Sequence, residues 1–253
     1  MAAAKTIKNQ LRGLGVTAGG VVLVHASMKA LGRRVAGGPD AVIDALLAAV
    51  GRDGTLLMPA LSYATVGPAQ PRFDARETPA CVGLLPEAFR RRPGVGRSVH
   101  PTHSVCGLGP RADEVLAEHA ADRTPVGPRS PFAKLREVGG QVLMLGCGLG
   151  PNTSMHGVEE LVEPPYLFRR APVTFEVVDT AGRAARAEHR VHDFGGWAQR
   201  YDRVAALMPP GAVRVGKVLG ATCHLLDARA MWDAGYAALT ADPLAFVEEA
   251  TTP

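Results

Sequence analysis

Three short apolar runs constrain the fold of this chain most strongly. Residues 21–24, 55–58 and 141–145 are almost continuously apolar, and each run is followed by a turn or loop that contains glycine or proline. Apolar runs without alternation are typical of strands that are covered on both faces. A glycine-containing loop and a strong helical pattern over residues 41–50 follow the first run. We therefore expect an α/β fold with helices on both faces of a sheet.

The remaining patterns predict shorter elements along the chain. Helices are expected over residues 6–14, 82–92, 113–120, 131–138, 197–207 and 228–239. Residues 173–178 alternate like an antiparallel strand, and we expect them to pair with residues 186–191 across a turn. Two short strands are expected within residues 213–226, and a terminal turn or helix over residues 243–250.

The composition is that of a globular protein. The chain has 253 residues, of which 47% are hydrophobic and 21% are charged, and no internal repeat or low-complexity linker divides it. We expect one domain over residues 1–253. Its four cysteines are widely scattered, without a C-x-x-C pair. No segment approaches the roughly 20 apolar residues of a membrane span. The first residues lack the apolar core of a signal peptide. A cytoplasmic protein without a membrane partner is therefore expected.

The net charge of +4 and the aromatic fraction of 5% exclude few partners outright. Because aromatic residues are scarce, the chain offers little surface on which bases could stack. We therefore expect no nucleic-acid partner. A mildly basic balance would suit a small polyanionic cofactor.

The stretch from Gly146 to Glu160 carries the most informative polar residues. A glycine-rich turn follows the third apolar run, and residues 152–154 (Asn-Thr-Ser) then offer helix N-cap chemistry. A helix that begins there places His156 and Glu159 on one face, because residues three apart are neighbours. A carboxylate can orient an imidazole that takes a proton near neutral pH, so this pair is a candidate acid/base site. The alternative is a capped surface helix that carries a histidine.

The loop after the first strand has features of an anion site. Gly37 and Gly38 allow close backbone approach at a helix N-terminus, and Lys29, Arg33 and Arg34 add positive charge. The loop matches neither a Walker motif nor a G-x-G-x-x-G fingerprint, so an ordinary connection between strand and helix stays open.

His100-x-x-His103, with His25 as a third ligand, raises the question of a metal site. Zinc requires three or four ligands, and no acidic or thiol partner stands at motif spacing. We expect no metal, and we expect these histidines to satisfy loop backbone groups or to line a site.

Many separated segments, in one order, resemble the aminoglycoside 3-N-acetyltransferase family, the antibiotic acetyltransferases outside the GNAT fold. The resemblance covers roughly residues 5–240. It is carried by residues 24–28, 37–38, 45–47, 54–59, 73–74 and 78–79, by Arg97-Ser98-x-His100-Pro101-x-x-Ser104 and Ser130-Pro131-Phe132-x-x-Leu135, and by Asn152-Thr153-x-x-His156-x-x-Glu159 and residues 216–218.

The resemblance implies an α/β–α fold with a central mixed sheet flanked by helices. It also implies direct transfer of an acetyl group from acetyl-coenzyme A to the 3-amino group of an aminoglycoside in a ternary complex. His156 would be the general base with Glu159 beside it, and Thr153, Ser104 or a backbone N–H would stabilise the oxyanion. The implied coenzyme-binding residues are Ser27, Met28, Lys29, Ala30, Leu31, Val35, Ala36, Gly37, Gly38, Ser98, Ser104 and Val105.

An aminoglycoside is a polycation, so a net basic protein would need a locally acidic acceptor pocket. Asp74, Glu159 and Asp193 are the favoured substrate-binding carboxylates, ahead of Glu77, Glu160 and Glu163. The family binds aminoglycoside partly through the region of residues 62–72, which is short here and has no carboxylate. Ala26 also departs from the Ser-Ser form of the coenzyme loop.

Three alternatives to this function stay open. The protein could acetylate another small amine, it could be a hydrolase that uses Cys147, His156 and Glu159, or it could bind coenzyme A without catalysis. Either a monomer or a homodimer is compatible with the sequence.

Overall fold

The computed structural model describes residues 2–32 and 35–250. Arg33 and Arg34, which we expected to add charge to the anion loop, lie outside the described residues. The α-helices are α1 (Ala2–Leu14), α2 (Gly38–Val50), α3 (Leu84–Arg90), α4 (Ala112–Leu116), α5 (Pro131–Glu137), α6 (Met155–Val162) and α7 (Ala228–Ala241), with 3₁₀ turns at His119–Ala121 and Tyr201–Ala206.

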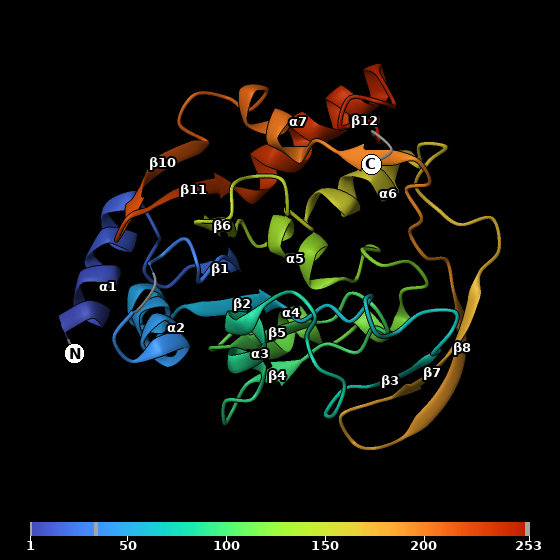
Figure 1. Ribbon diagram of the computed structural model, residues 1–253, viewed down its shortest axis with the longest axis horizontal. Coiled ribbons are helices and arrows are strands. Elements are labelled where there is room, and N and C mark those ends of the chain that lie inside the picture. Colours follow the sequence, from blue (N-terminus) through green and yellow to red (C-terminus); the bar gives the residue numbers. More distant parts are fainter. Residues whose placement is uncertain (1, 33–34, 251–253) are drawn as a thin grey trace.

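A seven-stranded mixed sheet forms the centre of the molecule (Figure 1). Its strand order is β10 (Val213–Val218), β11 (Ala221–Asp227), β6 (Gln141–Leu145), β1 (Val21–Ala26), β2 (Thr55–Pro59), β5 (Val105–Leu108) and β4 (Gly96–Arg97). Strand β1 pairs in parallel with both β2 and β6, while β5 and β11 pair antiparallel with their neighbours. The three apolar runs are thus the three adjacent parallel strands, as expected for strands buried on both faces.

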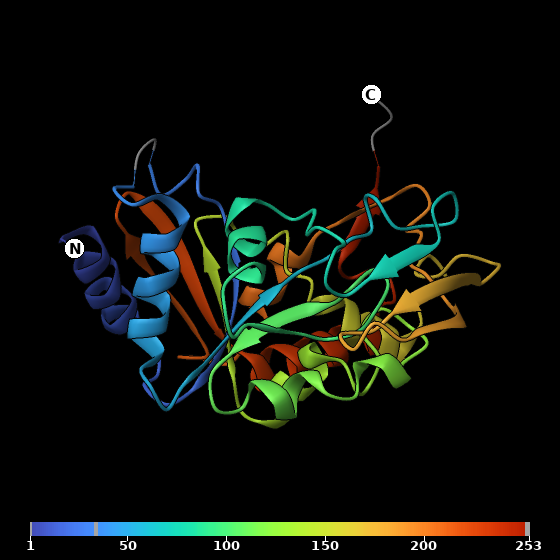
Figure 2. The ribbon, with the colours of Figure 1, turned by 90° about the horizontal axis from the view of Figure 1, so that it is seen from below.

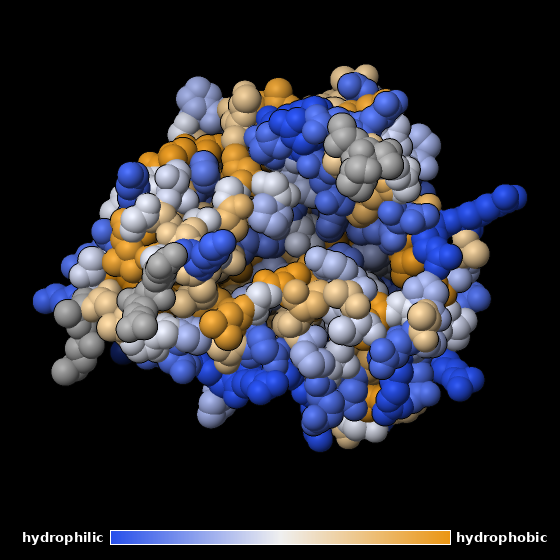
Figure 3. Space-filling model, in the orientation of Figure 1, coloured by the Kyte–Doolittle hydropathy of each residue, from blue (hydrophilic) through white to orange (hydrophobic). Residues whose placement is uncertain are grey.

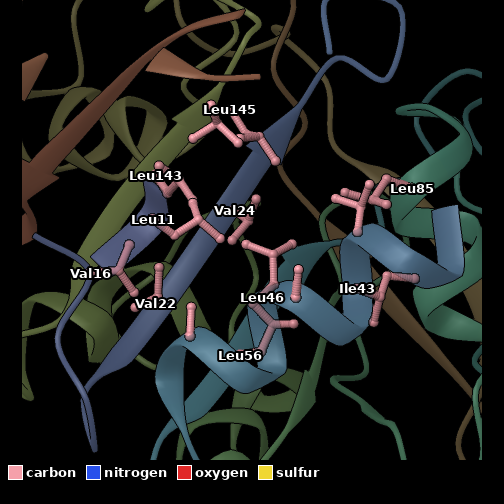
Figure 4. Close-up of a cluster of buried hydrophobic side chains, with 14 of the residues drawn as sticks. Leu11, Val16, Val22, Val24, Ile43, Leu46, Leu56, Leu85, Leu143 and Leu145 are labelled. Atoms are coloured by element: carbon pink, nitrogen blue, oxygen red, sulfur yellow. The ribbon is translucent and has the colours of Figure 1, made fainter. Parts of the chain in front are cut away.

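Helices cover both faces of this sheet (Figure 2). Alternate strand residues point to opposite faces, so Val22 and Val24 join one core with α1 and α2, and Val21 and Leu23 join the other. Figure 4 shows the first of these cores, in which Leu46 of α2 lies near the side chains of β1. The expected mixed sheet flanked by helices is confirmed.

Two smaller sheets lie beside the central one. Strand β3 (Arg72–Asp74) pairs in parallel with β7 (Val173–Val178), which forms the expected hairpin with β8 (Ala184–His189). Strand β9 (Trp197–Gln199) pairs with β12 (Val247–Glu249). None of the helices in the described part of the chain has the length and apolar character that a membrane span requires.

One expectation about local structure is wrong, and a second, the turn or helix over residues 243–250, holds only in part. Residues 197–207 form β9 and a 3₁₀ turn in place of one helix, because pairing with β12 holds residues 197–199 extended. Residues 243–250 include this strand β12 after a turn.

The N-terminus of α6 also differs from the expected cap. Ser154 occupies the N-cap position, but its side chain makes no capping hydrogen bond. Its hydroxyl oxygen instead accepts the indole N–H of Trp232 from α7, at 2.9 Å. This contact fixes α6 against α7, whereas Ser130 caps α5 as expected.

Candidate active site

The carboxyl ends of the parallel strands open into a cavity of about 510 Å³. His25 and Ala26 at the end of β1, Pro59 at the end of β2 and Cys147 just after β6 all line it. Strand β1 has β2 on one side and β6 on the other, so the cavity lies where the strand order reverses, a usual place for ligands in open α/β sheets. The space-filling view is hollowed near the middle of this face (Figure 3).

His156, in the first turn of α6, lines the cavity, and a fully buried carboxylate stands behind it. Glu159 Oε2 lies 3.2 Å from His156 Nδ1, and the Glu159 side chain is completely inaccessible to solvent. Tyr201 donates its hydroxyl hydrogen to Glu159 Oε2 at 2.6 Å, and Tyr166 donates to Oε1 at 3.0 Å. A buried carboxylate requires such partners, so both tyrosines hold Glu159 in place.

The same contacts determine which nitrogen of His156 carries the proton. The Tyr201 oxygen is also 2.7 Å from His156 Nδ1. Because the hydroxyl hydrogen of Tyr201 is directed to Glu159, the Tyr201 oxygen must accept a hydrogen from Nδ1. Nε2 of His156 therefore keeps its lone pair, as a general base requires.

Two further histidines surround His156. The ring centroids of His103 and His192 lie 5.7 and 4.9 Å from that of His156. His192 Nε2 is 2.8 Å from Glu160 Oε1, which also accepts the backbone N–H of Val126. Burial raises the pKa of Glu160 to about 8, although the Val126 N–H works in the opposite direction. Burial lowers the pKa of His103 and of His192 well below the usual value, so both rings are neutral.

The comparisons with known proteins identify the family. The sequence profile described as aminoglycoside 3-N-acetyltransferase matches residues 23–240. The chain belongs to the aminoglycoside 3-N-acetyltransferase family. It is 38% identical to aminoglycoside N(3)-acetyltransferase VIII of Streptomyces fradiae, over 86% of this chain and 85% of that protein. It is 39% identical to aminoglycoside N(3)-acetyltransferase IX of Micromonospora chalcea, over 88% of each chain.

Solved structures agree with this assignment. The structure of AAC-IIIb in a binary complex with CoASH superposes with a TM-score of 0.80 and 31% identity, covering 99% of this chain and 98% of that one. A histidine-to-alanine mutant of AAC(3)-IVa in complex with a gentamicin superposes with a TM-score of 0.81, 31% identity, and coverage of 96% and 90%. This chain is therefore an acyltransferase, as the sequence indicated.

The first predicted coenzyme segment of this acetyltransferase lies beside the cavity. Ser27 follows the lining residues of β1, and its hydroxyl accepts the backbone N–H of Ala30. The residues from Met28 to Leu31 and from Val35 onward lead into α2, where Gly37 and Gly38 adopt φ angles of 86° and 61°. These left-handed angles favour glycine, which explains why glycine occupies positions 37 and 38.

The second predicted coenzyme segment is not at the cavity. Ser98, Ser104 and Val105 are buried, and none of them lines it. The Ser98 hydroxyl accepts the Val105 N–H, and the Ser104 hydroxyl donates to the Ala60 carbonyl. Both hydroxyls therefore already serve the fold, and neither is placed to contact a ligand in the cavity.

Arg97 explains much of this motif. Its guanidinium donates to Ser104 Oγ and to the carbonyl oxygens of Ala60, Ala75 and Thr78. Burial lowers the pKa of Arg97 to about 10. The Arg-Ser-x-His-Pro segment thus ties the edge of the sheet to the loop before α3.

The predicted substrate carboxylates are not gathered around the cavity. The carboxylate of Asp74 accepts the backbone N–H groups of Arg76 and Glu77, and Asp193 is exposed between the lining residues His192 and Phe194. Among the described residues, no aspartate or glutamate lines the cavity. Glu159 lies behind His156, Glu160 pairs with His192, and Glu163 pairs with Arg190.

The H-x-x-H pair does not act as one unit. His100 Nδ1 accepts the backbone N–H groups of Thr102 and His103, as expected for a histidine that satisfies a loop. His103 and His25 instead line the cavity. Burial, with a smaller contribution from His156, lowers the pKa of His25 to about 3.

The structure argues against Cys147 as a nucleophile. Burial raises the pKa of its thiol to about 11, whereas a nucleophilic cysteine needs a lowered pKa. Its sulfur contacts the Gly148 carbonyl, at 3.7 Å.

Sequence reasoning does not find the two tyrosines. The pattern over residues 197–207 places Tyr201 in a helix, and Tyr166 follows a proline pair without a recognisable motif. A buried Glu159 needs hydrogen-bond donors from elsewhere in the chain. The phenol groups of the tyrosines could supply such donors, and this is the one sequence signal that points to them.

Proposed function

We propose that the protein transfers an acetyl group from acetyl-coenzyme A to the 3-amino group of an aminoglycoside, with His156 as general base in a ternary complex. One observation carries this proposal: Tyr201 and Glu159 together hold the Nδ1 hydrogen of His156, so its Nε2 lone pair is free at the cavity. The CoASH and gentamicin complexes of the two related enzymes support the choice of substrates.

The chemistry requires a base at this position. An amine attacks the thioester carbonyl only after it loses its extra proton, and His156 Nε2 is the acceptor for that proton. That first proton passes on to solvent. As the C–N bond forms, His156 Nε2 takes a second proton from the attacking nitrogen and returns it to the sulfur as the C–S bond breaks, which leaves an amide and CoASH. Holding amine and thioester in one cavity would lower the barrier further.

Thr153 is the remaining side-chain candidate for the oxyanion. It lines the cavity one turn before His156, and its side chain is nearly buried. Ser104 is a poorer candidate, because its hydroxyl donates to Ala60. A positioned donor of this kind contributes about 3 kcal/mol to transition-state stabilisation in other acyl-transfer enzymes.

The proposed coenzyme path runs along the loop that connects β1 to α2. The glycines there leave the backbone open to the phosphates, and α2 offers its N-terminal N–H groups. From this loop the thioester end would reach the cavity past Ala26 and Cys147, which line it.

A second candidate function is acetylation of a less charged amine. The cavity wall presents aromatic rings from Tyr63, Phe194 and Tyr201 in place of carboxylates. Aromatic faces attract one ammonium group by cation–π contact, but they do not neutralise a polycation. Asp193, which is exposed between the lining residues His192 and Phe194, is a candidate partner for a second ammonium group.

Coenzyme A release, measured against a panel of acceptors, tests the proposal. The panel contains gentamicin, apramycin and several simple monoamines, and mass spectrometry identifies the acetylated position. Acetylation of N3 of an aminoglycoside supports the first candidate, and turnover of monoamines alone supports the second. Coenzyme binding without turnover of any acceptor would contradict both.

A further inference from the structure

Three histidines from separate segments of the chain converge on the cavity. His103 lies in the loop between β4 and β5, His156 begins α6, and His192 follows β8. One ring nitrogen from each histidine lies within 4.8 Å of one ring nitrogen from each of the others. All three side chains line the cavity.

In the rings of His103 and His156, one nitrogen has a hydrogen-bond partner and the other nitrogen is available to bind a ligand. His103 Nδ1 pairs with the hydroxyl of Thr102 at 2.9 Å, which leaves Nε2. His156 Nδ1 pairs with Glu159 and Tyr201, which again leaves Nε2. In both rings the hydrogen-bond contact at Nδ1 holds the ring in place, and Nε2 is the nitrogen that remains available.

His192 has the opposite arrangement. Its Nε2 lies 2.8 Å from Glu160 Oε1, which also accepts the backbone N–H of Val126. Its Nδ1 is buried and has no hydrogen-bond partner within the described ranges, and the side chain is only 6% exposed. A buried ring nitrogen without a partner is uncommon in native structures and needs an explanation.

We propose that His103, His156 and His192 form a binding site for Zn²⁺, and that the bound ion inhibits the enzyme. Three imidazoles with an open fourth position form a common zinc site. The carboxylates of Glu159 and Glu160 behind two of the rings match the carboxylate–histidine–zinc arrangement.

Inhibition follows from the position of the ion. Zn²⁺ on Nε2 of His156 would occupy the lone pair that accepts the substrate proton, and it would fill the space of the incoming amine. The transfer reaction itself uses no metal. This inhibitory effect rests on the proposed function, whereas zinc binding does not.

The rings must move closer to bind the ion. Tetrahedral zinc with Zn–N bonds of about 2.0–2.1 Å requires nitrogens about 3.4 Å apart. One nitrogen of each ring lies within 4.8 Å of one nitrogen of the others, so displacements of about 1 Å at the ring tips would suffice. An open cavity on one side of the rings leaves room for such rotations.

The enzyme is first treated with a chelator and transferred to a buffer without thiol reductants. Calorimetric titration with ZnSO₄ then tests binding without any assay of activity. One ion per chain is expected. Titration with Co²⁺ should give the intense visible bands of a tetrahedral site. His192→Gln should weaken zinc binding at least 100-fold.

His224→Gln is the matched control. His224 on β11 also has a buried Nδ1 without a hydrogen-bond partner in the described chain, but it is not part of the cluster. This variant should bind zinc like the wild type. His103→Gln provides a second test if His192→Gln melts at a lower temperature.

Unchanged zinc affinity in both cluster variants, or no binding to the wild type at 100 µM zinc, would overturn the proposal. Inhibition is measured by mass spectrometry of the acetylated product, because zinc would also bind the released coenzyme thiol. Wild-type turnover should fall with zinc and recover with EDTA. Zinc binding without inhibition would contradict the inhibitory role, and absence of turnover in the metal-free enzyme would count against the proposed function alone.

Discussion

The hydroxyl of Tyr201 lies 2.6 Å from Glu159 Oε2 and donates its hydrogen to that buried carboxylate. Its oxygen is then left to accept from His156, which fixes the tautomer of the proposed base. A residue 45 positions away from His156 in the chain thus determines how the imidazole presents its lone pair. The proposed catalytic unit is a network of four side chains, with Tyr166 as the fourth member.

Tyr201→Phe should slow acetyl transfer while coenzyme binding stays intact. The substitution removes one hydrogen bond to a charged group, which contributes about 1.5–3 kcal/mol, and it frees His156 to adopt the other tautomer. We expect kcat to fall roughly 10- to 100-fold, with little change in KM for acetyl-coenzyme A.

Tyr166→Phe is the matched control for this prediction. Among the described residues, the Tyr166 hydroxyl hydrogen-bonds to Glu159 Oε1 alone and makes no hydrogen bond to His156. Its replacement should lower the melting temperature to a similar degree but reduce kcat less. Equal kcat values for the two variants would show that Tyr201 acts only through stability.

The buried histidines should make the protein sensitive to acid. Burial lowers the pKa of His119 to about 3 and of His189 to about 4, and His25, His100, His103 and His192 are also shifted downward. Because the unfolded histidines titrate near pH 6.5, the unfolded state binds more protons below that pH. Stability should therefore be complete above pH 6.5 and fall as the pH drops.

The size of this effect can be bounded. Each such histidine removes about 1.4 kcal/mol per pH unit below pH 6.5. Glu160, whose pKa burial raises to about 8, opposes this trend, and so does Asp122, whose pKa burial also raises. Circular dichroism should show a lower melting temperature at pH 5 than at pH 7.5, and an unchanged melting temperature between these two pH values would refute the argument.

Replacement of Cys147 by alanine should preserve turnover. A thiol with a pKa near 11 is almost fully protonated at neutral pH, so it cannot serve as the attacking group. Turnover of an aminoglycoside by Cys147→Ala should stay within about threefold of wild type, since only a few cavity contacts change. Complete loss of activity in a normally folded variant would revive the hydrolase alternative.

Gly157→Ala should displace helix α6, which carries His156, and should therefore lower both stability and activity. A Cβ atom at this position would clash with the Trp232 ring and come within 2.7 Å of Val126. The added methyl group would push α6 away from α7, at a cost of about 1–3 kcal/mol. Differential scanning calorimetry should show a lower melting temperature, and kcat should fall because His156 is the neighbouring residue.

Gly13→Ala is the control for this change. Nothing lies within 4 Å of the position that an alanine Cβ would take at Gly13 in α1, so the methyl group meets no obstacle. Alanine in a helix should stabilise the protein by up to about 1 kcal/mol. If the two variants melted at the same temperature, close packing at Gly157 would not matter.

The sequence was sufficient to predict the central architecture. Residues 21–24, 55–58 and 141–145 lie in the three adjacent parallel strands because their uniform apolar character suits only a sheet buried on both faces. His156 and Glu159 are indeed neighbours, because a helix begins where the Asn-Thr-Ser segment ends. Local rules were enough for these features.

The rest of the site depends on contacts between distant segments. Tyr201 reaches Glu159 only because β9 pairs with β12, and each of these strands has three residues. The convergence of His103 and His192 on His156 likewise depends on how loops from different sheets meet. Ser98 and Ser104 belong to a motif that could equally serve a ligand or the fold, and only their buried hydrogen bonds reveal the structural role.

The most direct test of the account compares wild-type enzyme with His156→Gln in one experiment. Mass spectrometry would follow acetylation of an aminoglycoside by acetyl-coenzyme A, and calorimetry would measure coenzyme binding. We predict a loss of turnover of about 10²- to 10⁴-fold, typical of a general base, with coenzyme affinity nearly unchanged. A His156→Gln variant that acetylates at the wild-type rate would contradict the central claim.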